Sequence, residues 1–185
     1  MAERARRSQR LSPVAALSDA ELQERALRYL DRFDSTAARL RQVLYRHVQR
    51  ATGDADLRRE GCARVDAVVQ RLAEAKLIDD ARFATTSALG LRQRGRSQAA
   101  IRQKLRSRGV AAEDLELALS ESLAECTELD AAREYVRRRG LGPHRPPDER
   151  RARAQRDLAA LARAGFGSDV ARRALEADDD SDPTP

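Results

Sequence analysis

Apolar residues recur every three or four positions through most of this chain, a spacing that places them on one face of an α-helix. The clearest stretch contains Val65, Val68, Val69 and Leu72, which fit positions i, i+3, i+4 and i+7 of a helix. No stretch alternates apolar and polar residues with the period of two that is typical of a half-buried strand, and β-branched residues are sparse. The sequence therefore predicts an all-α fold.

The composition limits how thick the core of such a fold can be. Hydrophobic residues make up 41% of the 185 residues, but many of them are alanines, which bury little area each. At roughly 25 cal/mol per Å² of buried apolar surface, an alanine-rich seam stabilises a fold less than a core of leucine and phenylalanine does. Because alanine and arginine are strong helix formers, we expect thin helices in an open array rather than one thick globule.

Capping and turn signals mark where helices begin and end. Ser18 followed by Glu21 predicts a capping box for a first helix, and Asp34 or Ser35 is the candidate N-cap of a second. A polar connection is expected over residues 52–61.

Three further expectations concern single positions and one loop. The first helix is expected to carry Phe33 on its apolar face. Adjacent prolines in the loop 142–147 disfavour a helix there, and Ser168 is the candidate N-cap of the last helix.

A short acidic motif, Asp79-Asp80, precedes the helix that carries Phe83 and Ala84. Acidic residues at a helix N-cap accept hydrogen bonds from its first N–H groups and stabilise it by roughly 0.5–2 kcal/mol. A catalytic pair of carboxylates would need a further acid or a metal-ligand set, and none lies at a useful spacing. We therefore interpret both aspartates as helix caps and Phe83 as a core residue, with stacking of Phe83 on a nucleic-acid base as the alternative. Gly109 is expected to end the following helix.

The pattern also repeats along the chain. Leu105 and Gly109 correspond in spacing to Leu161 and Gly165, and each repeat reads as three helices. One such unit buries little apolar surface alone, so stacked units would share a seam, although amphipathic helices of similar composition can also match by coincidence. The prediction is a set of tandem three-helix repeats that form an elongated, curved helical array. The expected divisions are a flexible basic arm over 1–17, repeats over 18–78, 79–123 and 124–177, and an acidic disordered tail over 178–185.

Charge is segregated within a chain whose formal net charge is +6. Residues 91–109 carry seven basic side chains and no acidic one, whereas residues 110–132 carry seven acidic side chains and no basic one. Compensation of helix dipoles favours basic residues late in one helix and acidic residues early in the next, but it does not require seven basic residues without an acidic one among them. We therefore predict that basic residues contact a partner. The candidate contact residues are Arg92, Arg94, Arg96, Arg102, Lys104 and Arg106, with Arg133, Arg137 and Arg138 as a second patch.

Other chemistry has little support in the sequence. There is no phosphate-cradling glycine loop, no nucleophile beside a base and no cluster of metal ligands, so we expect no enzymatic activity and no cofactor. Cys62 and Cys126 stand alone, which favours a reducing, cytoplasmic location. No run approaches the roughly 18 apolar residues that a membrane span requires. We expect a monomer that makes no contact with a membrane.

A helix-turn-helix is the alternative interpretation. The stretch from Gln98 to Leu119 fits two helices around a turn at Gly109, as in many DNA-binding proteins. The basic stretch would then contact DNA phosphates. Sequence-selective binding would favour this alternative, whereas nonspecific binding to single- or double-stranded DNA fits either interpretation.

Two consecutive phrases of the sequence carry a resemblance to a known family. They read Leu72-x₄-Leu77-Ile78-Asp79-Asp80-x₂-Phe83-Ala84 and Arg94-Gly95-x-Ser97-x₃-Ile101-x₃-Leu105-x₃-Gly109-Val110. The chain resembles the RecX family of bacterial regulatory proteins over roughly residues 20–177, and most specifically from Val65 to Leu119. It departs from the family pattern at Lys76, where a glycine is usual, and from its own repeat at His47.

The resemblance implies both a partner and an activity. RecX proteins bind the RecA recombinase, mainly as its filament on single-stranded DNA. They lower its ATPase, strand-exchange and co-protease activities by lying along the filament groove or by blocking filament growth, and so modulate homologous recombination, DNA repair and the SOS response. An elongated helical array suits such a partner, because repeated weak contacts to successive subunits gain strength through effective concentration.

Overall fold

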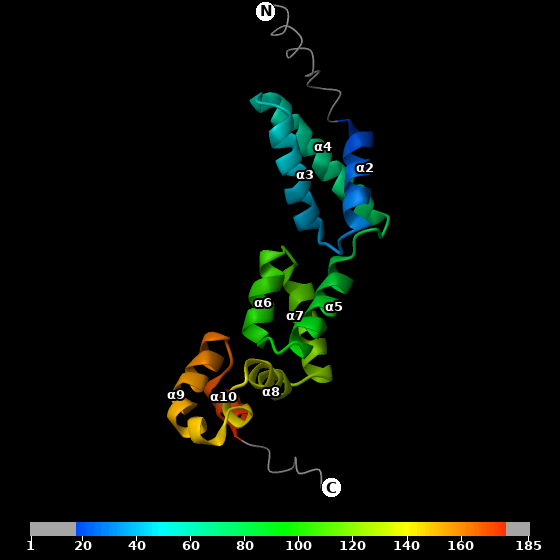
Figure 1. Cartoon of the computed structure of the whole chain (residues 1–185). Coiled ribbons are helices and arrows are strands. Elements are labelled where there is room, and N and C mark those ends of the chain that lie inside the picture. Colours follow the sequence, from blue (N-terminus) through cyan, green and yellow to red (C-terminus); the bar gives the residue numbers. More distant parts are fainter. Residues whose placement is uncertain (1–17, 177–185) are drawn as a thin grey trace, which may run out of the picture. The chain divides into compact units, whose positions relative to one another are not determined.

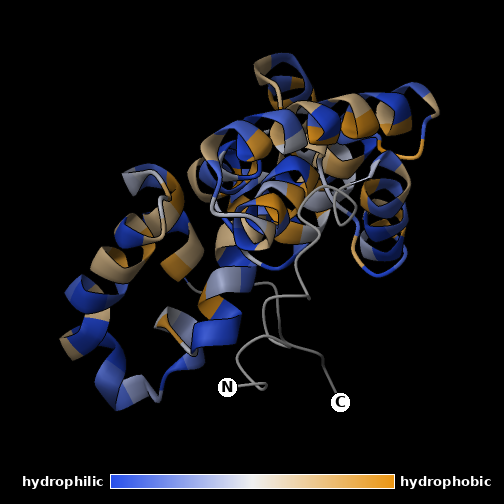
Figure 2. Cartoon of the chain, turned by 90° about the horizontal axis from the view of Figure 1, so that it is seen from above, coloured by the Kyte–Doolittle hydropathy of each residue, from blue (hydrophilic) through white to orange (hydrophobic). Residues whose placement is uncertain are grey.

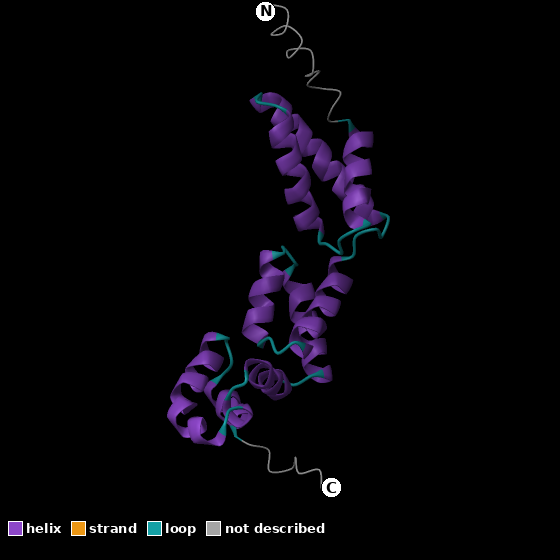
Figure 3. Cartoon of the chain, in the orientation of Figure 1, coloured by secondary structure: helices purple, strands orange, loops and turns teal. Residues whose placement is uncertain are grey.

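The computed structural model describes residues 18–176, and all regular structure within that range is helical (Figures 1 and 3), which confirms the prediction of an all-α fold. The helices are α2 (Asp19–Leu30), α3 (Ala37–Ala51), α4 (Ala55–Glu74), α5 (Asp80–Gln93), α6 (Gln98–Ser107), α7 (Ala112–Glu125), α8 (Glu128–Arg139), the 3₁₀ turn η3 (Gly142–His144), α9 (Pro147–Arg163) and α10 (Ser168–Leu175). The predicted basic arm and acidic tail lie outside the described residues.

The chain forms two compact units, one that extends to Phe83 and one that begins at Ala84. Helix α5 therefore begins in the first unit and continues in the second. Hydrophobic and hydrophilic residues alternate along the helices (Figure 2), as expected of amphipathic helices that each bury one face. The helices follow one another as three triplets would, and the exact boundaries of the repeats stay a prediction. None of the described helices is long and apolar enough to cross a membrane.

The first unit packs α2, α3 and α4 around a seam of aliphatic side chains. The buried residues of this core are Leu22, Ala26, Leu40, Leu44, Val48, Val65, Val68, Val69, Leu72 and Ile78. Burial of each leucine or valine contributes about 1.5–3 kcal/mol. A polar contact lies beside the seam, where the Tyr45 hydroxyl donates to Asp66 Oδ1 at 2.5 Å. Burial, reinforced by this hydrogen bond, raises the pKa of Tyr45 to about 12.

The helix starts in the first unit only partly follow the sequence signals. The capping box of Ser18 and Glu21 is confirmed. The N-cap of α3 is Thr36, whose side chain accepts the N–H of Arg39, so the expectation of Asp34 or Ser35 is wrong. Thr36 is the residue that immediately precedes the first helical turn and has the extended backbone that an N-cap requires.

The expected connection over residues 52–61 is mostly helix instead. Asp54 caps α4 by accepting the N–H groups of Asp56 and Leu57, at 2.8 and 3.0 Å. Gly61 lies buried within α4 and does not end the helix. The polar residues after Asp54 form exposed helical turns, so their polarity marked a solvated face rather than a loop.

The two aspartates of the acidic motif cap different helices. Asp79 Oδ1 accepts the N–H of Arg82 at 2.9 Å and so caps α5, as expected. Asp80 Oδ1 accepts the N–H of Ala37, the first residue of α3, at 2.8 Å. The motif therefore joins the start of α5 to the start of α3 within the first unit. Phe83 and Ala84, one turn further along, are both buried.

The second unit is built from smaller side chains. Its buried residues on α5, α6 and α7 include Ala84, Ala88, Ile101, Leu105, Leu115, Ala118 and Leu119. A further cluster on α8 to α10 contains Ala131, Ala132, Val136, Leu141, Leu161, Phe166, Ala171 and Ala174. Gly109 follows the end of α6 with a φ of 75°, which confirms its predicted role as a stop.

Three expectations about where helices begin and end are wrong. Pro147 is the first residue of α9, where the missing N–H has no intrahelical partner to lose, so the prolines begin a helix rather than block one. Ser168 is the first residue of α10, and its N-cap is Gly167. Phe33 follows the end of α2 and is 54% exposed, so it does not belong to the apolar seam.

The two departures from the glycine pattern have different outcomes. His47 lies inside α3, which continues to Ala51, so no helix ends there. Lys76 has a φ of 57°, the left-handed conformation that favours glycine, and Leu77 N–H donates to Leu72 O at 3.0 Å across it. The chain thus keeps a glycine-type helix end with a lysine in the strained position.

We predict that Lys76→Gly stabilises the first unit by about 0.5–1 kcal/mol, because it removes a left-handed lysine at the cost of extra chain entropy. Urea unfolding followed by circular dichroism measures the change. Ala75→Gly is the matched control: Ala75 has an ordinary φ of −75°, so glycine there should destabilise by about the same amount. Destabilisation by both variants would contradict the assignment of strain to Lys76.

A buried carboxylate makes the second unit sensitive to acid. Asp157 accepts two hydrogen bonds from Arg145, both at 2.8 Å, and one from Gly142 N–H at 2.9 Å. The bonds from Arg145, supported by that from Gly142, hold the pKa of Asp157 below its usual range. A carboxyl whose pKa is depressed on folding stabilises the fold above its unfolded pKa of about 3.9 and loses that contribution as the pH falls through the folded pKa.

We therefore expect Asp157→Asn to be less stable than the original chain at neutral pH, and the difference to shrink as the pH falls below about 4. Thermal unfolding of both proteins across that range measures it. The other acidic residues are present in both proteins, so their titration cancels from the difference. A gap that stays constant with pH would contradict the role of the Asp157 charge.

Candidate partner-binding surface

Arg92, the first of the predicted contact residues, is fully buried in the second unit. Its Nη1 lies 2.7 Å from Glu128 Oε2, and its Nε donates to Ser122 Oγ at 3.2 Å. Its Nη2 is also buried, without a hydrogen-bond partner among the described residues. The expectation that Arg92 contacts a partner is wrong, because its guanidinium is buried and forms an ion pair with Glu128 inside the unit. Its spacing of four from Ala88, itself four from Ala84, is the signal that places it on the buried face of α5.

Glu128 joins three helices through one carboxylate. Besides Arg92 on α5, it accepts the N–H of Gln98, the first residue of α6, at 3.0 and 3.1 Å. Glu128 is itself the first residue of α8. The carboxylate therefore stabilises the start of α6 while it neutralises a buried cation.

The turn between α5 and α6 packs closely on α8 and on the end of α9. Ser97 caps α6, as predicted, and its Oγ also donates to Ala164 O at 2.6 Å. Gly95 has a φ of 76°, and a Cβ there would lie 2.7 Å from the backbone N of Tyr135. This close approach brings the residues on either side of Gly95 next to the last turns of α8.

Members of both predicted patches, Arg94 and Arg96 from the first and Arg138 from the second, line one surface hollow, which we call the arginine hollow. It has a volume of about 410 Å³ and is lined by Leu91, Arg94, Gly95, Arg96, Tyr135, Arg138 and Arg139. Arg94 and Arg96 are exposed, and within residues 18–176 their side chains form no hydrogen bond or ion pair. Arg139, which was not among the candidates, lies over the ring of Tyr135 at 5.5 Å from its centroid.

The remaining candidates lie at least partly at the surface, and Arg102 and Arg137 among them form ion pairs that can be described. Arg102 forms a two-pronged ion pair with Glu116 across α6 and α7. Arg137 makes a similar pair with Glu134, at 2.7 and 2.8 Å, and these hydrogen bonds raise the pKa of Arg137 and lower that of Glu134. Lys104, Arg106 and Arg133 are exposed. Exposed ion pairs contribute at most about 1 kcal/mol, so Arg102 and Arg137 are held less firmly than Arg92.

These features define a class of protein: an all-α chain of successive helix triplets with a cationic hollow on the surface of its second unit. No group of three or more potential metal-binding side chains occurs within the described part of the chain.

Comparison with known proteins places the chain within that class. The sequence profile of the second three-helix domain of RecX matches residues 79–119. A Regulatory protein RecX of Myxococcus xanthus is 40% identical over 162 residues, which cover 86% of this chain and 87% of the relative. A Regulatory protein RecX of Halorhodospira halophila is 35% identical over 93% of this chain and 96% of the relative. No solved structure matches the chain. The chain belongs to the RecX family of regulatory proteins.

We predict that Arg92→Ala destabilises the second unit by about 3–5 kcal/mol, because it leaves the carboxylate of Glu128 partly buried beside an empty space. Arg94→Ala, two residues away and exposed, should change stability by no more than about 0.5 kcal/mol. Urea unfolding of the full chain measures both. Equal effects of the two variants would show that the Arg92–Glu128 pair does not hold the unit together.

Proposed function

We propose that this chain binds the RecA recombinase filament on single-stranded DNA and inhibits its ATPase, strand-exchange and co-protease activities, and so modulates recombination and DNA repair. The observation that carries the proposal is the match to RecX regulatory proteins over most of the chain, at 40% identity to the protein of Myxococcus xanthus. The chain acts as a regulator, without catalysis of its own and without a cofactor. It works as a monomer in the cytoplasm, a location that the two free and separate cysteines support.

The arginine hollow is the proposed contact surface. Its cations Arg94, Arg96 and Arg138 come from two different helix regions, and no carboxylate lines the hollow. Guanidinium groups bind carboxylates in a two-pronged geometry that fixes both position and orientation. A cluster of such groups therefore suits an acidic surface on a protein partner. Lys104 and Arg106, exposed on α6, are further proposed contact residues.

The helix-turn-helix alternative has less support. In such proteins the first turn of the second helix contacts base edges, and the flanking residues contact phosphates. The second helix here would be α7, whose first turn carries Glu113 and Asp114, and which contains no basic residue. Negative charge at that position repels the phosphate backbone, so α6 and α7 are poorly suited to enter a DNA groove.

The decisive measurement is the ATPase rate of RecA on single-stranded DNA with increasing amounts of this protein. The original chain should inhibit at stoichiometric amounts. The triple variant Arg94→Glu, Arg96→Glu, Arg138→Glu should need at least about tenfold more protein, which corresponds to a loss of about 1.4 kcal/mol in binding.

The matched control makes the same charge change on α9. Arg151, Arg156 and Arg163 are exposed, and their reversal to glutamate should leave inhibition unchanged within about twofold, since only net charge is altered. If the original chain fails to inhibit, the proposed function is wrong. If both triple variants lose inhibition equally, the function stands and the arginine hollow is not the contact surface.

A further inference from the structure

A second cationic groove lies in the first unit, where none of the predicted contact residues is found. It has a volume of about 330 Å³ and runs between α2 and α3. Its lining includes Arg25, Arg28, Arg32 and Arg50 together with the aromatic residues Tyr29 and Phe33. No carboxylate lines this groove, which we call the aromatic groove.

The aromatic side chains of this groove are partly exposed to solvent, although apolar rings are usually buried. Phe33 is 54% exposed, and its ring packs against Tyr29 with the centroids 5.0 Å apart. The backbone holds it there, because Phe33 N–H donates to Tyr29 O at 3.0 Å. Phe33 is thus a half-exposed ring that packs on Tyr29, and it is not a core residue.

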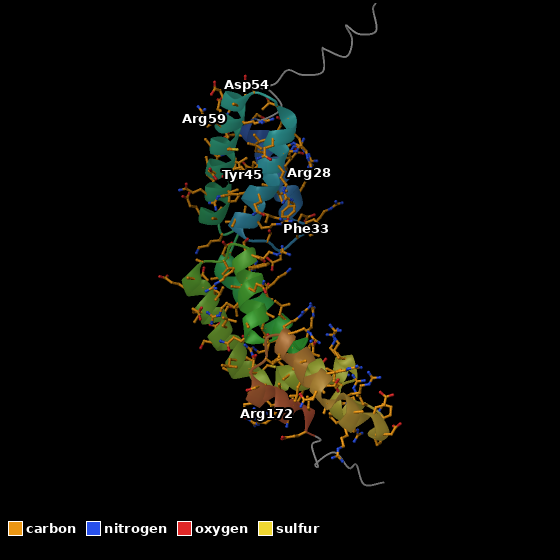
Figure 4. The ribbon with its side chains drawn as sticks, turned by 90° about the vertical axis from the view of Figure 1, so that its left-hand side faces the viewer. Arg28, Phe33, Tyr45, Asp54, Arg59 and Arg172 are labelled. Carbon is orange, nitrogen blue, oxygen red and sulfur yellow. The ribbon has the colours of Figure 1, made fainter. Side chains whose placement is uncertain are left out.

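The arginines surround these rings on the same side of the unit. Figure 4 shows Arg28 and Phe33 on one side of the first unit, and Arg59 near its opposite edge. Within residues 18–176 the side chains of Arg25, Arg32 and Arg50 form no hydrogen bond or ion pair, whereas Arg28 pairs with Glu24 at 2.6 Å. Three guanidinium groups therefore remain available to an anionic ligand.

His47, which also lines the groove, lies in surroundings with an excess of positive charge. Burial lowers the pKa of His47, and the charges of Arg25 and Arg50 lower it further, against a smaller opposing effect of Glu21. The imidazole is therefore neutral near pH 7, and the charge of the groove comes from its arginines.

We infer that the aromatic groove binds single-stranded nucleic acid, with a base stacked on Phe33 and phosphates contacted by Arg25, Arg32 and Arg50. Every base presents a flat π-face, so stacking on a fixed ring combined with cations beside it binds single strands with little sequence preference. In a duplex the base faces are already stacked on one another, so Phe33 gains nothing from double-stranded DNA. An acidic peptide would use the arginines but would leave the exposed ring without a partner.

The first test replaces Phe33 with a tryptophan, whose fluorescence reports on what binds at that position. The chain contains no tryptophan, so Phe33→Trp places a single indole in the groove and keeps a flat ring there. Addition of an oligothymidylate of about 20 nucleotides, longer than typical sites of about 4–16, should quench its fluorescence. Polyglutamate and a duplex of equal length should leave the emission unchanged when they are added at the concentration at which oligothymidylate saturates the protein.

The second test measures affinity by fluorescence anisotropy of the labelled oligothymidylate. Phe33→Leu keeps the apolar bulk and the charge but removes the aromatic face, and it should weaken binding at least about fivefold, the loss of one stacked base. Arg32→Ala should reduce the slope of log affinity against log salt by about 0.7, the value for one phosphate of a single strand. Arg59→Ala removes one positive charge as well, at an exposed position of the same unit outside the groove. It should alter affinity by less than about twofold.

The inference is overturned if oligothymidylate binds the Phe33→Trp protein without quenching its indole emission, or if Phe33→Leu binds as tightly as the original chain. It is also overturned if polyglutamate quenches as strongly, which would assign the groove to an acidic peptide. Since no RecA is present in these measurements, their outcome does not depend on the proposed function, and loss of RecA inhibition would not explain it.

Discussion

The second unit depends on the pairing of one buried cation with one carboxylate. A guanidinium among apolar side chains is strongly destabilising unless an anion meets it, so the fold of this unit requires Glu128 to lie beside Arg92. The same carboxylate accepts the N–H of Gln98, which fixes the start of α6 against the start of α8. The turn that carries Arg94 and Arg96 is thereby pressed onto α8, beside Arg138. The ion pair inside the unit, together with the close approach of Gly95 to Tyr135, thus positions the cations that line the hollow on its surface.

Local chemistry explains which parts of this architecture the sequence predicts. Ser18 with Glu21, Ser97 and Gly109 act on the turns next to them, so their roles can be read without knowledge of the fold. The start of α4 was missed because charged residues after Asp54 form an exposed helical face, which has the composition of a loop. The pairing of Arg92 with Glu128 spans 36 positions. Only the spacing of Arg92 from Ala88 hinted at its burial, and nothing local identified its partner.

The same reasoning separates the two basic surfaces. The block of basic residues over 91–109 predicted that cations gather there, but not which of them stay available. Glu116 and Glu134 engage Arg102 and Arg137, and these contacts depend on how the helices pack or on side-chain rotamers. The aromatic groove could not be predicted, because helical spacing assigns Phe33 to the apolar face of α2. The helix ends before that residue, and the ring turns out to solvent.

Alanine forms much of the contact surface inside the second unit, at Ala84, Ala88, Ala118, Ala131 and Ala132, each with no exposed area. Helices that meet through methyl groups lie close together and leave no space for a larger side chain, so a valine or leucine at these positions would force the backbones apart. Truncation, the usual threat to a hydrophobic core, removes little where the side chain is already a single carbon. The buried alanine positions of this unit should therefore tolerate a smaller side chain better than a larger one.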